Sequence, residues 1–294
     1  MLNKSTAAFV LLSAWALSIS CGSAKHAKGS KNLMPGTWQS TPIAIDGDSK
    51  DWPSPYPNYD AKSMVGYATS NDRQNLYITM QTGDLLTQMK ILKQGMTVTI
   101  DTNGKKDGQF NINYPLENDI EMIDPKQDLK ERKDNQGYAA KKLDQKLDKG
   151  MQSANQFSLD GFSTCDGGYI ITQTTPCGIK VRARIDEYRQ LVWEAVVPFR
   201  VMYNKEMITE ADAGKPVSVC FTVNKFVYQN KTSGGDNNNT GMNNAGGMNN
   251  NMTTPGRNSS RGGQHGGRSN TQDPYQQLYE KTNTWKQFTL VYQK

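Results

Sequence analysis

The chain has 294 residues, a formal net charge of +6 and 35% hydrophobic residues. Without a leader and two low-complexity segments, roughly 200 residues remain to be packed, which is the size of one sandwich domain. Basic residues are spread along the sequence rather than clustered, so we expect no nucleic-acid partner. The two histidines, His26 and His265, both lie in low-complexity segments. A core without histidine excludes Ser-His-Asp and Cys-His catalysis, histidine-ligated haem and the common zinc and iron sites, so we expect no cofactor and no metal.

Residues 1–20 predict a lipoprotein signal peptide, because a positively charged start precedes an apolar run over 7–17. That run is shorter than the roughly 20 apolar residues of a membrane-spanning helix. The stretch Leu-Ser-Ile-Ser-Cys-Gly that follows resembles a bacterial lipobox, in which the cysteine thiol is acylated, so Cys21 is the expected lipidation site. Ser18 stands where the lipobox usually has leucine, so cleavage after Ala24 by an ordinary signal peptidase remains an alternative.

Residues 21–40 are predicted to form a flexible tether, because the stretch after the cysteine is small and basic. Acyl chains such as palmitate would then anchor the protein to a bacterial membrane, since stable anchoring takes more than one chain. Lipoproteins of the outer surface often carry acidic residues directly after the cysteine, and this chain carries none there. We therefore expect a cell-envelope protein on the outer membrane, facing the periplasm.

Alternating apolar and polar residues predict many short strands in a single domain over 41–294. The predicted strands cover 64–70, 75–82, 96–100, 110–114, 179–185, 191–197, 217–227 and 284–292. Strands with one apolar and one polar face pack in pairs of sheets, and few segments predict helices. The sequence thus predicts an all-β fold, an antiparallel two-sheet β-sandwich of jelly-roll-like type.

Two segments interrupt this strand pattern. Residues 124–150 hold fourteen charged residues and predict a charged, partly helical insertion on the surface. Residues 230–272 are rich in Asn and Gly and bury too little apolar area to offset the entropy of ordering, so they predict a disordered loop. We interpret the loop as a tolerated insertion in a surface hairpin; contact with a polymer or a partner is the alternative.

The cysteines other than the lipidation site favour one disulfide. Cys165 and Cys177 lie twelve residues apart, each beside turn residues, around a strand-like stretch at 169–173. In an oxidising periplasm this pattern predicts a disulfide that closes a hairpin. Cys220 remains, and we interpret it as a small strand residue without chemistry. No fourth ligand completes a zinc site, and the turn at 101–107 departs from the calcium-binding EF-hand pattern because lysines occupy ligand positions.

Five spaced segments resemble the family 9 carbohydrate-binding-module-like group, which is related to DOMON domains. They are Ile-Asp-Gly at 45–47 with Trp52, the Asn-Asp-Arg-Gln-Asn-Leu-Tyr of 71–77, the Asp-Thr-Asn-Gly-Lys of 101–105, the Trp-Glu-Ala of 193–195 and the closing strand at 285–290. The segments follow one another in family order. The resemblance implies two antiparallel sheets; members of the family bind saccharide ends, haem or sugars on electron-transfer enzymes, or no known ligand. The missing core histidine argues against haem.

Sugar binding requires exposed aromatic rings beside groups that hydrogen-bond hydroxyls. Four aromatic residues with Pro, Gly or Asp neighbours are the candidate ligand-binding residues, with ordinary loop packing as the alternative for each: Trp38, Tyr56, Tyr59 and Tyr169. Three tryptophans of the signature segments are expected in the core instead: Trp52, Trp193 and Trp285.

The sequence therefore favours a lipid-anchored, non-catalytic binding module for a saccharide or cell-wall polymer. An envelope scaffold that binds other envelope proteins through its two insertions is the first alternative. A carboxylate-based glycoside hydrolase is the second, and it would require two acids about 5 to 10 Å apart in a cleft. The available acids are Glu117, Asp119, Glu121, Asp186, Glu187 and Glu194, and nothing in their spacing selects a pair.

Overall fold

The computed structural model describes residues 33–116, 124–227 and 275–294, all within one compact unit, Leu33–Lys294. The predicted signal peptide, the lipidation site Cys21 and the loop 230–272 lie outside the described residues. So do Glu117, Asp119 and Glu121. No helix in the described ranges is both long and apolar enough to span a membrane.

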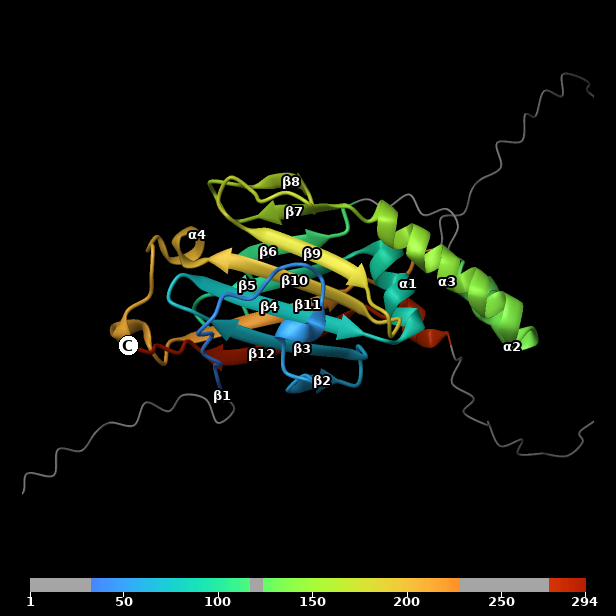
Figure 1. Ribbon diagram of the computed structural model, residues 1–294, viewed down its shortest axis with the longest axis horizontal. Helices are drawn as coiled ribbons and strands as arrows, with labels where there is room; N and C mark the ends of the chain where they lie inside the picture. The colour runs from blue at the N-terminus through green and yellow to red at the C-terminus, as the bar shows by residue number, and fades with distance from the viewer. Residues whose placement is uncertain (1–32, 117–123, 228–274) are drawn as a thin grey trace, which may run out of the picture. The chain divides into compact units, whose positions relative to one another are not determined.

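The described residues form a β-sandwich of two sheets, which confirms the predicted fold class (Figure 1). One sheet has seven strands in the order β1 (Met34–Pro35), β12 (Thr282–Thr289), β11 (Pro216–Val223), β5 (Met96–Asp101), β6 (Phe110–Tyr114), β7 (Gln156–Asp160) and β8 (Gly167–Ile170). The other has five, in the order β2 (Asn58–Asp60), β3 (Val65–Asn71), β4 (Asn75–Thr82), β10 (Leu191–Pro198) and β9 (Lys180–Ile185). All strand pairs are antiparallel except β1 with β12.

The main core lies between the two sheets, because each strand turns one apolar face inward. Trp193 of β10 and Met80 of β4 are fully buried, as is Val98 of β5 in the other sheet. The rings of Tyr67 and Phe221 meet across the two layers with centroids 5.2 Å apart. Burial of each such large side chain is worth roughly 1.5–3 kcal/mol, so this layer supplies most of the stability.

The three longest helices lie at one end of the sandwich and α4 at the other (Figure 1). The charged insertion contains α2 (Pro125–Asp134) and α3 (Gln136–Ser153), so the prediction of a partly helical insertion is confirmed. Sequence analysis missed α1 (Leu85–Gln94), which begins where the Asp84 carboxylate accepts a hydrogen bond from the Thr87 amide and ends at Gly95, whose φ is +74°. The remaining helical turns are η1 (Ser49–Asp51), α4 (Phe199–Tyr203), η2 (Glu210–Asp212) and η3 (Gln276–Tyr279).

The outer face of the five-stranded sheet is covered by the chain between residues 43 and 56. Ile43, Trp52 and Tyr56 of that segment are buried against the sheet. Together with sheet residues they form a second, smaller core cluster; the sheet contributes Ala68, Tyr77 and Val196. One face of this sheet therefore packs on the main core and the other on the N-terminal segment.

A buried carboxylate joins this covering segment to the sheet. Glu194 of β10 is fully buried and accepts hydrogen bonds from the Trp52 indole N–H at 2.6 Å and from the backbone amides of Gly47 at 2.7 Å and Asp46 at 3.1 Å. Gly47 has a φ of +82°, and a Cβ there would lie 3.0 Å from the Cβ of Arg184. Two of the signature segments thus meet at one carboxylate, which explains why Ile-Asp-Gly, Trp and Glu occur together.

Residues 33–40 belong to the sandwich and not to the tether in which they were predicted. Met34 and Pro35 pair with β12, and Gln39 donates its backbone N–H to the Asn71 carbonyl at 2.8 Å. The predicted boundary at residue 41 is therefore too late. The error arose because a two-residue strand carries no periodic signal.

The predicted disulfide between Cys165 and Cys177 is present, with Cα atoms 6.0 Å apart. It links the segment before β8 to the one before β9. Cys220 is a free thiol buried in β11, in line with its interpretation as a small strand residue. Burial raises the pKa of the Cys220 thiol, which keeps it protonated and unreactive.

Candidate functional site

The four predicted ligand-binding aromatics do not share one site. Tyr59 is 61% exposed on the short edge strand β2, where its hydroxyl donates to the Met64 sulfur. Tyr169 is half-buried on β8, packs on Phe157 and donates its hydroxyl to the Cys165 carbonyl. These rings lie on edge strands of different sheets, and neither lines a cavity described below.

Tyr56 is a core residue, so its prediction as an exposed stacking ring is wrong. Only 9% of it is exposed, and its hydroxyl hydrogen-bonds the Thr79 hydroxyl at 3.0 Å on the covered face of the sheet. Burial raises its pKa to about 12. The neighbouring prolines, which indicated a loop, lie in a segment that packs against the sheet.

Trp38 is the predicted residue that the structure places in a cavity. The cavity has a volume of about 320 Å³ and is built from three separate parts of the chain: residues 38–42, the β3–β4 turn and Met207. The indole is half-buried and meets the Tyr292 ring edge-on, with centroids 6.4 Å apart and planes at 71°. An edge-on contact leaves most of one indole face available to a ligand.

Asn71 holds the segments around this cavity in place. It is 1% exposed, and its backbone amide donates to the Thr37 carbonyl at 2.9 Å. Its side-chain amide donates to the Val291 carbonyl at 2.8 Å and accepts from the Val291 amide at 3.0 Å. One buried residue therefore fixes both the segment that carries Trp38 and the terminal segment that carries Tyr292.

The β3–β4 turn supplies the polar wall of the Trp38 cavity. The Asp72 carboxylate accepts from the backbone amides of Gln74 and Asn75, both at 2.6 Å, and from the Tyr77 hydroxyl at 2.7 Å, so it stiffens the turn. Gln74 is exposed, and its side-chain amide has no hydrogen-bond partner among the described residues. Arg73 lies 5.3 Å from the centroid of the Tyr292 ring and donates to the Gln293 carbonyl. The wall thus offers a free amide and a positioned guanidinium beside an aromatic ring.

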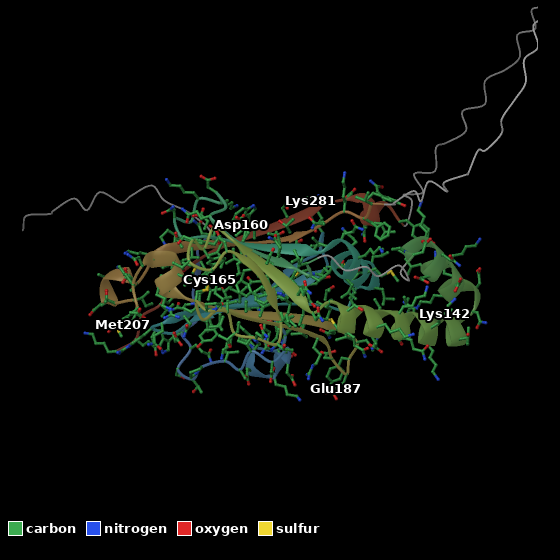
Figure 2. All side chains as sticks on the ribbon, turned by 90° about the horizontal axis from the view of Figure 1, so that it is seen from above. Lys142, Asp160, Cys165, Glu187, Met207 and Lys281 are labelled. Carbon is green, nitrogen blue, oxygen red and sulfur yellow. A yellow bond between two sulfur atoms is a disulfide. The ribbon has the colours of Figure 1, made fainter. Side chains whose placement is uncertain are left out.

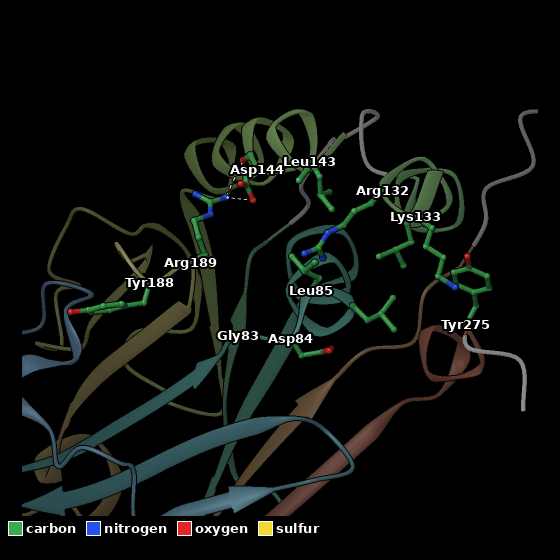
Figure 3. A pocket seen from close by; sticks show the side chains of 13 residues that line it. Gly83, Asp84, Leu85, Arg132, Lys133, Leu143, Asp144, Tyr188, Arg189 and Tyr275 are labelled. Atoms are coloured by element: carbon green, nitrogen blue, oxygen red, sulfur yellow. Dashed lines mark hydrogen bonds and ion pairs between the residues drawn. The ribbon is translucent and has the colours of Figure 1, made fainter. Parts of the chain in front are cut away.

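A second, larger cavity of about 1020 Å³ lies beneath the helical insertion (Figure 3). Leucines of three helices line its floor, and Arg132 and Lys133 of α2 stand at its rim. Tyr188, at the β9–β10 turn, is 76% exposed, but Figure 3 shows its ring turned away from Leu85 and Leu143. This groove combines aliphatic and charged side chains, with Tyr188 and Tyr275 among the residues that line it.

The outer face of the seven-stranded sheet is polar and at least partly exposed on β5 and β6. Thr97 donates to Asn113 at 2.8 Å and Thr99 to Asn111 at 2.7 Å, so these side chains largely satisfy one another. Figure 2 shows Asp160 and Lys281 on this side of the molecule and Glu187 on the opposite side. Because these polar side chains are partly exposed and pair with one another, we interpret this face as a solvent-facing surface.

Of the three tryptophans expected in the core, Trp52 and Trp193 are buried, at 5% and 0% exposure. Trp285 is only half-buried, so that prediction is wrong. In β12, Trp285 pairs with Cys220 and lies out of phase with the inward-facing Phe288. The sequence of β12 could have shown this. Residues an odd number of positions apart face opposite sides of a sheet, so Trp285 and Phe288 cannot both face the core.

Two of the acids considered for catalysis make structural contacts. Asp186 accepts hydrogen bonds from the amides of Tyr188 and Gln190 within its own turn, and Glu194 serves the buried contact described above. The Asp101 carboxylate accepts from three backbone amides of its turn, those of Asn103, Lys105 and Asp107. Among the described residues, no group of three His, Cys, Asp or Glu side chains is arranged to hold a metal.

No protein-family model matches the chain, and no curated protein matches it. Similar solved structures include two of a carbohydrate binding module family 9 from Caldicellulosiruptor kristjanssonii, one in complex with cellotriose and one with glucose. The first has 12% sequence identity and a TM-score of 0.29, and the match covers 65% of this chain and 75% of that chain. The second has 11% identity and a TM-score of 0.29, with coverage of 66% and 78%.

Proposed function

We propose that this protein is a non-catalytic binding module of the cell envelope, anchored by lipid at Cys21, that takes a saccharide or cell-wall polymer in the Trp38 cavity. The observation that carries the proposal is the half-buried indole of Trp38 beside the unpartnered amide of Gln74 and the guanidinium of Arg73. The sequence resemblance to family 9 modules favours the same class of ligand.

The chemistry of the Trp38 cavity suits a sugar ring. A pyranose has an apolar face of C–H bonds that packs on an indole, and hydroxyls around its edge that need donors and acceptors. A side-chain amide supplies both, and a guanidinium supplies donors only. Ligand pockets usually range from roughly 300 to 1,000 Å³, so a cavity of about 320 Å³ fits a chain end better than a long stretch of polymer.

The rigidity of the cavity supports recognition of a preformed site. Trp38, Tyr292 and the β3–β4 turn are all tied to the buried Asn71 or to Asp72. Side chains that are already ordered lose less conformational entropy when a ligand binds. More of the interaction energy with a sugar therefore remains as binding free energy.

The first test is thermal unfolding of a soluble form beginning at Asn32, scanned against saccharides and cell-wall fragments. A ligand that binds only the folded state stabilises it by about 2.7 kcal/mol at about 100 times its Kd. We expect Trp38→Ala and Gln74→Ala to abolish the shift, and Tyr138→Ala, which removes a ring that is 74% exposed on α3, to retain it. An unchanged shift in Trp38→Ala would contradict the proposed site, and no shift with any saccharide would favour the scaffold alternative.

The lipid anchor has a separate test. We expect Cys21→Ser to move the protein from the membrane fraction to the soluble fraction, because the acylated thiol is the proposed anchor. Metabolic labelling with a fatty acid should mark the wild type and not the variant. A mature chain that begins at Lys25 would show cleavage after Ala24 instead and would contradict lipidation.

A further inference from the structure

The groove beneath the helical insertion has an aliphatic floor that the fold leaves partly open. Leu85 and Leu86 of α1 and Leu129 of α2 are only half-buried, and all three line the cavity of about 1020 Å³ together with Ala140 and Leu143 of α3. Helices that pack directly on one another bury such side chains. Here the leucines of three helices face a shared space, which a ligand with an apolar body can fill.

The rim of the groove is cationic. Arg132 makes no ion pair with a described residue, and Figure 3 shows its guanidinium extending from α2 toward Leu85. Lys133 lies 5.9 Å from the centroid of the Tyr275 ring and likewise has no carboxylate partner among the described residues. The groove is also lined by one acid of α1's N-terminal cap, Asp84. Its carboxylate accepts a hydrogen bond from the Thr87 amide at 2.8 Å and pairs with neither Arg132 nor Lys133.

The third cation of the groove, Arg189, is already neutralised. Its guanidinium pairs with Asp148 at 2.6 Å and with Asp144 at 3.4 Å on α3, and its carbonyl accepts from Gln88 of α1 at 2.7 Å. Arg189 therefore fixes α3 and α1 to the β9–β10 turn. The positive charge left for a ligand belongs to Arg132 and Lys133, at the end of the groove near α2.

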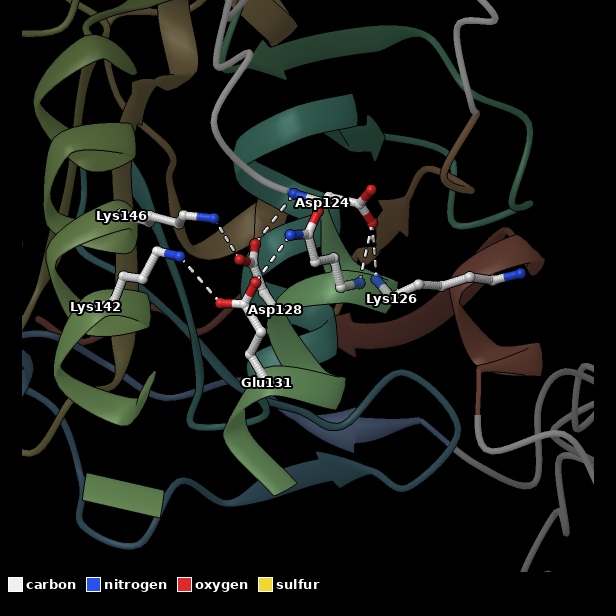
Figure 4. Close-up of polar contacts among 7 residues, drawn as sticks. Asp124, Lys126, Asp128, Glu131, Lys142 and Lys146 are labelled. Atoms are coloured by element: carbon white, nitrogen blue, oxygen red, sulfur yellow. Dashed lines mark hydrogen bonds and ion pairs between the residues drawn. The ribbon is translucent and has the colours of Figure 1, made fainter. Parts of the chain in front are cut away.

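An ion-pair network holds α2 against α3 and thereby fixes this end of the groove (Figure 4). The buried carboxylate of Asp128 pairs with Lys146 and accepts from the Asp124 amide at 3.1 Å. Glu131 pairs with Lys142 at 3.0 Å. Breaking a buried pair by removing one partner usually costs about 3–5 kcal/mol, so α2 is held firmly and the positions of Arg132 and Leu129 are set by the fold.

We propose that this groove binds a free, single-chain fatty-acid-type anion, with the chain on the leucine floor and the carboxylate at Arg132 and Lys133. Arg132 and Lys133, which form no ion pair with a described residue, select the charge of the head group, because a hydrogen bond between a charged donor and a carboxylate is about twice as strong as a neutral one. The half-exposed leucines select an aliphatic body. The site is separate from the Trp38 cavity in both residues and chemistry.

The experiment is isothermal titration calorimetry of the soluble form beginning at Asn32 with three probes that share a twelve-carbon chain and are kept below micelle-forming concentrations. They are dodecanoate, dodecyltrimethylammonium and dodecyldimethylamine oxide, which carries neither a net charge nor a sugar. We expect saturable binding of dodecanoate alone. Arg132→Gln should weaken it on the order of tenfold, whereas Lys130→Gln, a charge removed from the same helix outside the groove, should leave it unchanged.

A second variant tests the floor independently of charge. Ala140→Phe places a ring in the groove from α3 and should abolish dodecanoate binding without altering the unfolding temperature markedly. Trp38→Ala should bind dodecanoate as the wild type does, so failure of the saccharide proposal and failure of this one are distinguishable. Equal binding of the cationic probe, equal loss in Lys130→Gln, or binding to anionic lipid vesicles without binding of monomeric dodecanoate would each overturn the inference.

Discussion

Replacing Glu194 with alanine should destabilise the domain more than any other single loss of a carboxylate among the described residues. The change leaves the Trp52 indole N–H and the amides of Gly47 and Asp46 without their acceptor. A buried donor left unsatisfied costs about 1–3 kcal/mol. The variant also loses the desolvation penalty of the buried carboxylate, which offsets part of that cost. We expect a net loss of about 3–5 kcal/mol, which lowers the melting temperature by about 10 °C in a domain of this size.

The pH dependence of this effect follows from the environment of Glu194. Burial raises its pKa to about 7 from an ordinary 4.5, although the three hydrogen bonds oppose that shift. The folded state then holds a proton that the unfolded state has released between pH 4.5 and about 7. The contribution of Glu194 to the free energy of unfolding is therefore fully present below pH 4.5. It falls as pH rises from 4.5 to about 7, by about 3 kcal/mol at most.

Urea denaturation of the wild type, Glu194→Ala, Glu194→Gln and the exposed control Glu187→Ala across this pH window measures both effects. Glu194→Gln has no titrating group, so the stability difference between it and the wild type should shrink from pH 4.5 to 7. A difference that stays constant with pH, or a Glu194→Ala variant as stable as Glu187→Ala, would refute the assignment of Glu194 as the buried link between the covering segment and the sheet.

Three further predictions concern stability. Reducing the bond between Cys165 and Cys177, or replacing both with serine, should cost about 3 kcal/mol because the bond closes a loop with a sequence separation of 12; melting with and without reductant measures this. Asp212→Asn should destabilise the fold above pH 4 and flatten its acid denaturation, because hydrogen bonds from two lysines lower the pKa of the Asp212 carboxyl, so its contribution is lost as pH falls below 3.8. Lys90→Met should lower stability by about 2–3 kcal/mol in urea denaturation, because the ammonium donates to two carbonyls around η3 that would lose their donor. Equal stability of each variant and the wild type would contradict the corresponding contact.

The strands could be predicted from the sequence because alternation is a local property. Residues 64–70 and 75–82 both alternate and are joined by a short turn, and the structure pairs them as β3 and β4. The disulfide was likewise local, since its cysteines flank one strand. In contrast, α1 was missed although Leu85, Met89 and Leu92 have helical spacing and Asp84 and Gly95 stand at its two caps, because the segment has only ten residues.

Burial could not be predicted where it depends on distant partners. Tyr56 is buried because residues 43–56 fold over the outer face of a sheet, and nothing in the sequence around Tyr56 shows which sheet that segment covers. The Trp38 cavity joins residue 38 to the β3–β4 turn and to Met207, which are far apart in the sequence. Trp38 itself could be nominated as an aromatic in a loop, but its partner Gln74 could not, because an exposed Gln has no distinguishing pattern.

The central claim is that a saccharide contacts Trp38, and NMR of the tryptophan indole N–H signals tests it most directly. The soluble form would be titrated with cello-oligosaccharides and with cell-wall glycan fragments, and the signals assigned by single substitution. The account predicts that a ligand shifts the Trp38 signal progressively to saturation while the signal of the buried Trp193 stays in place. Saturable binding of a saccharide that leaves the Trp38 signal unmoved would contradict it.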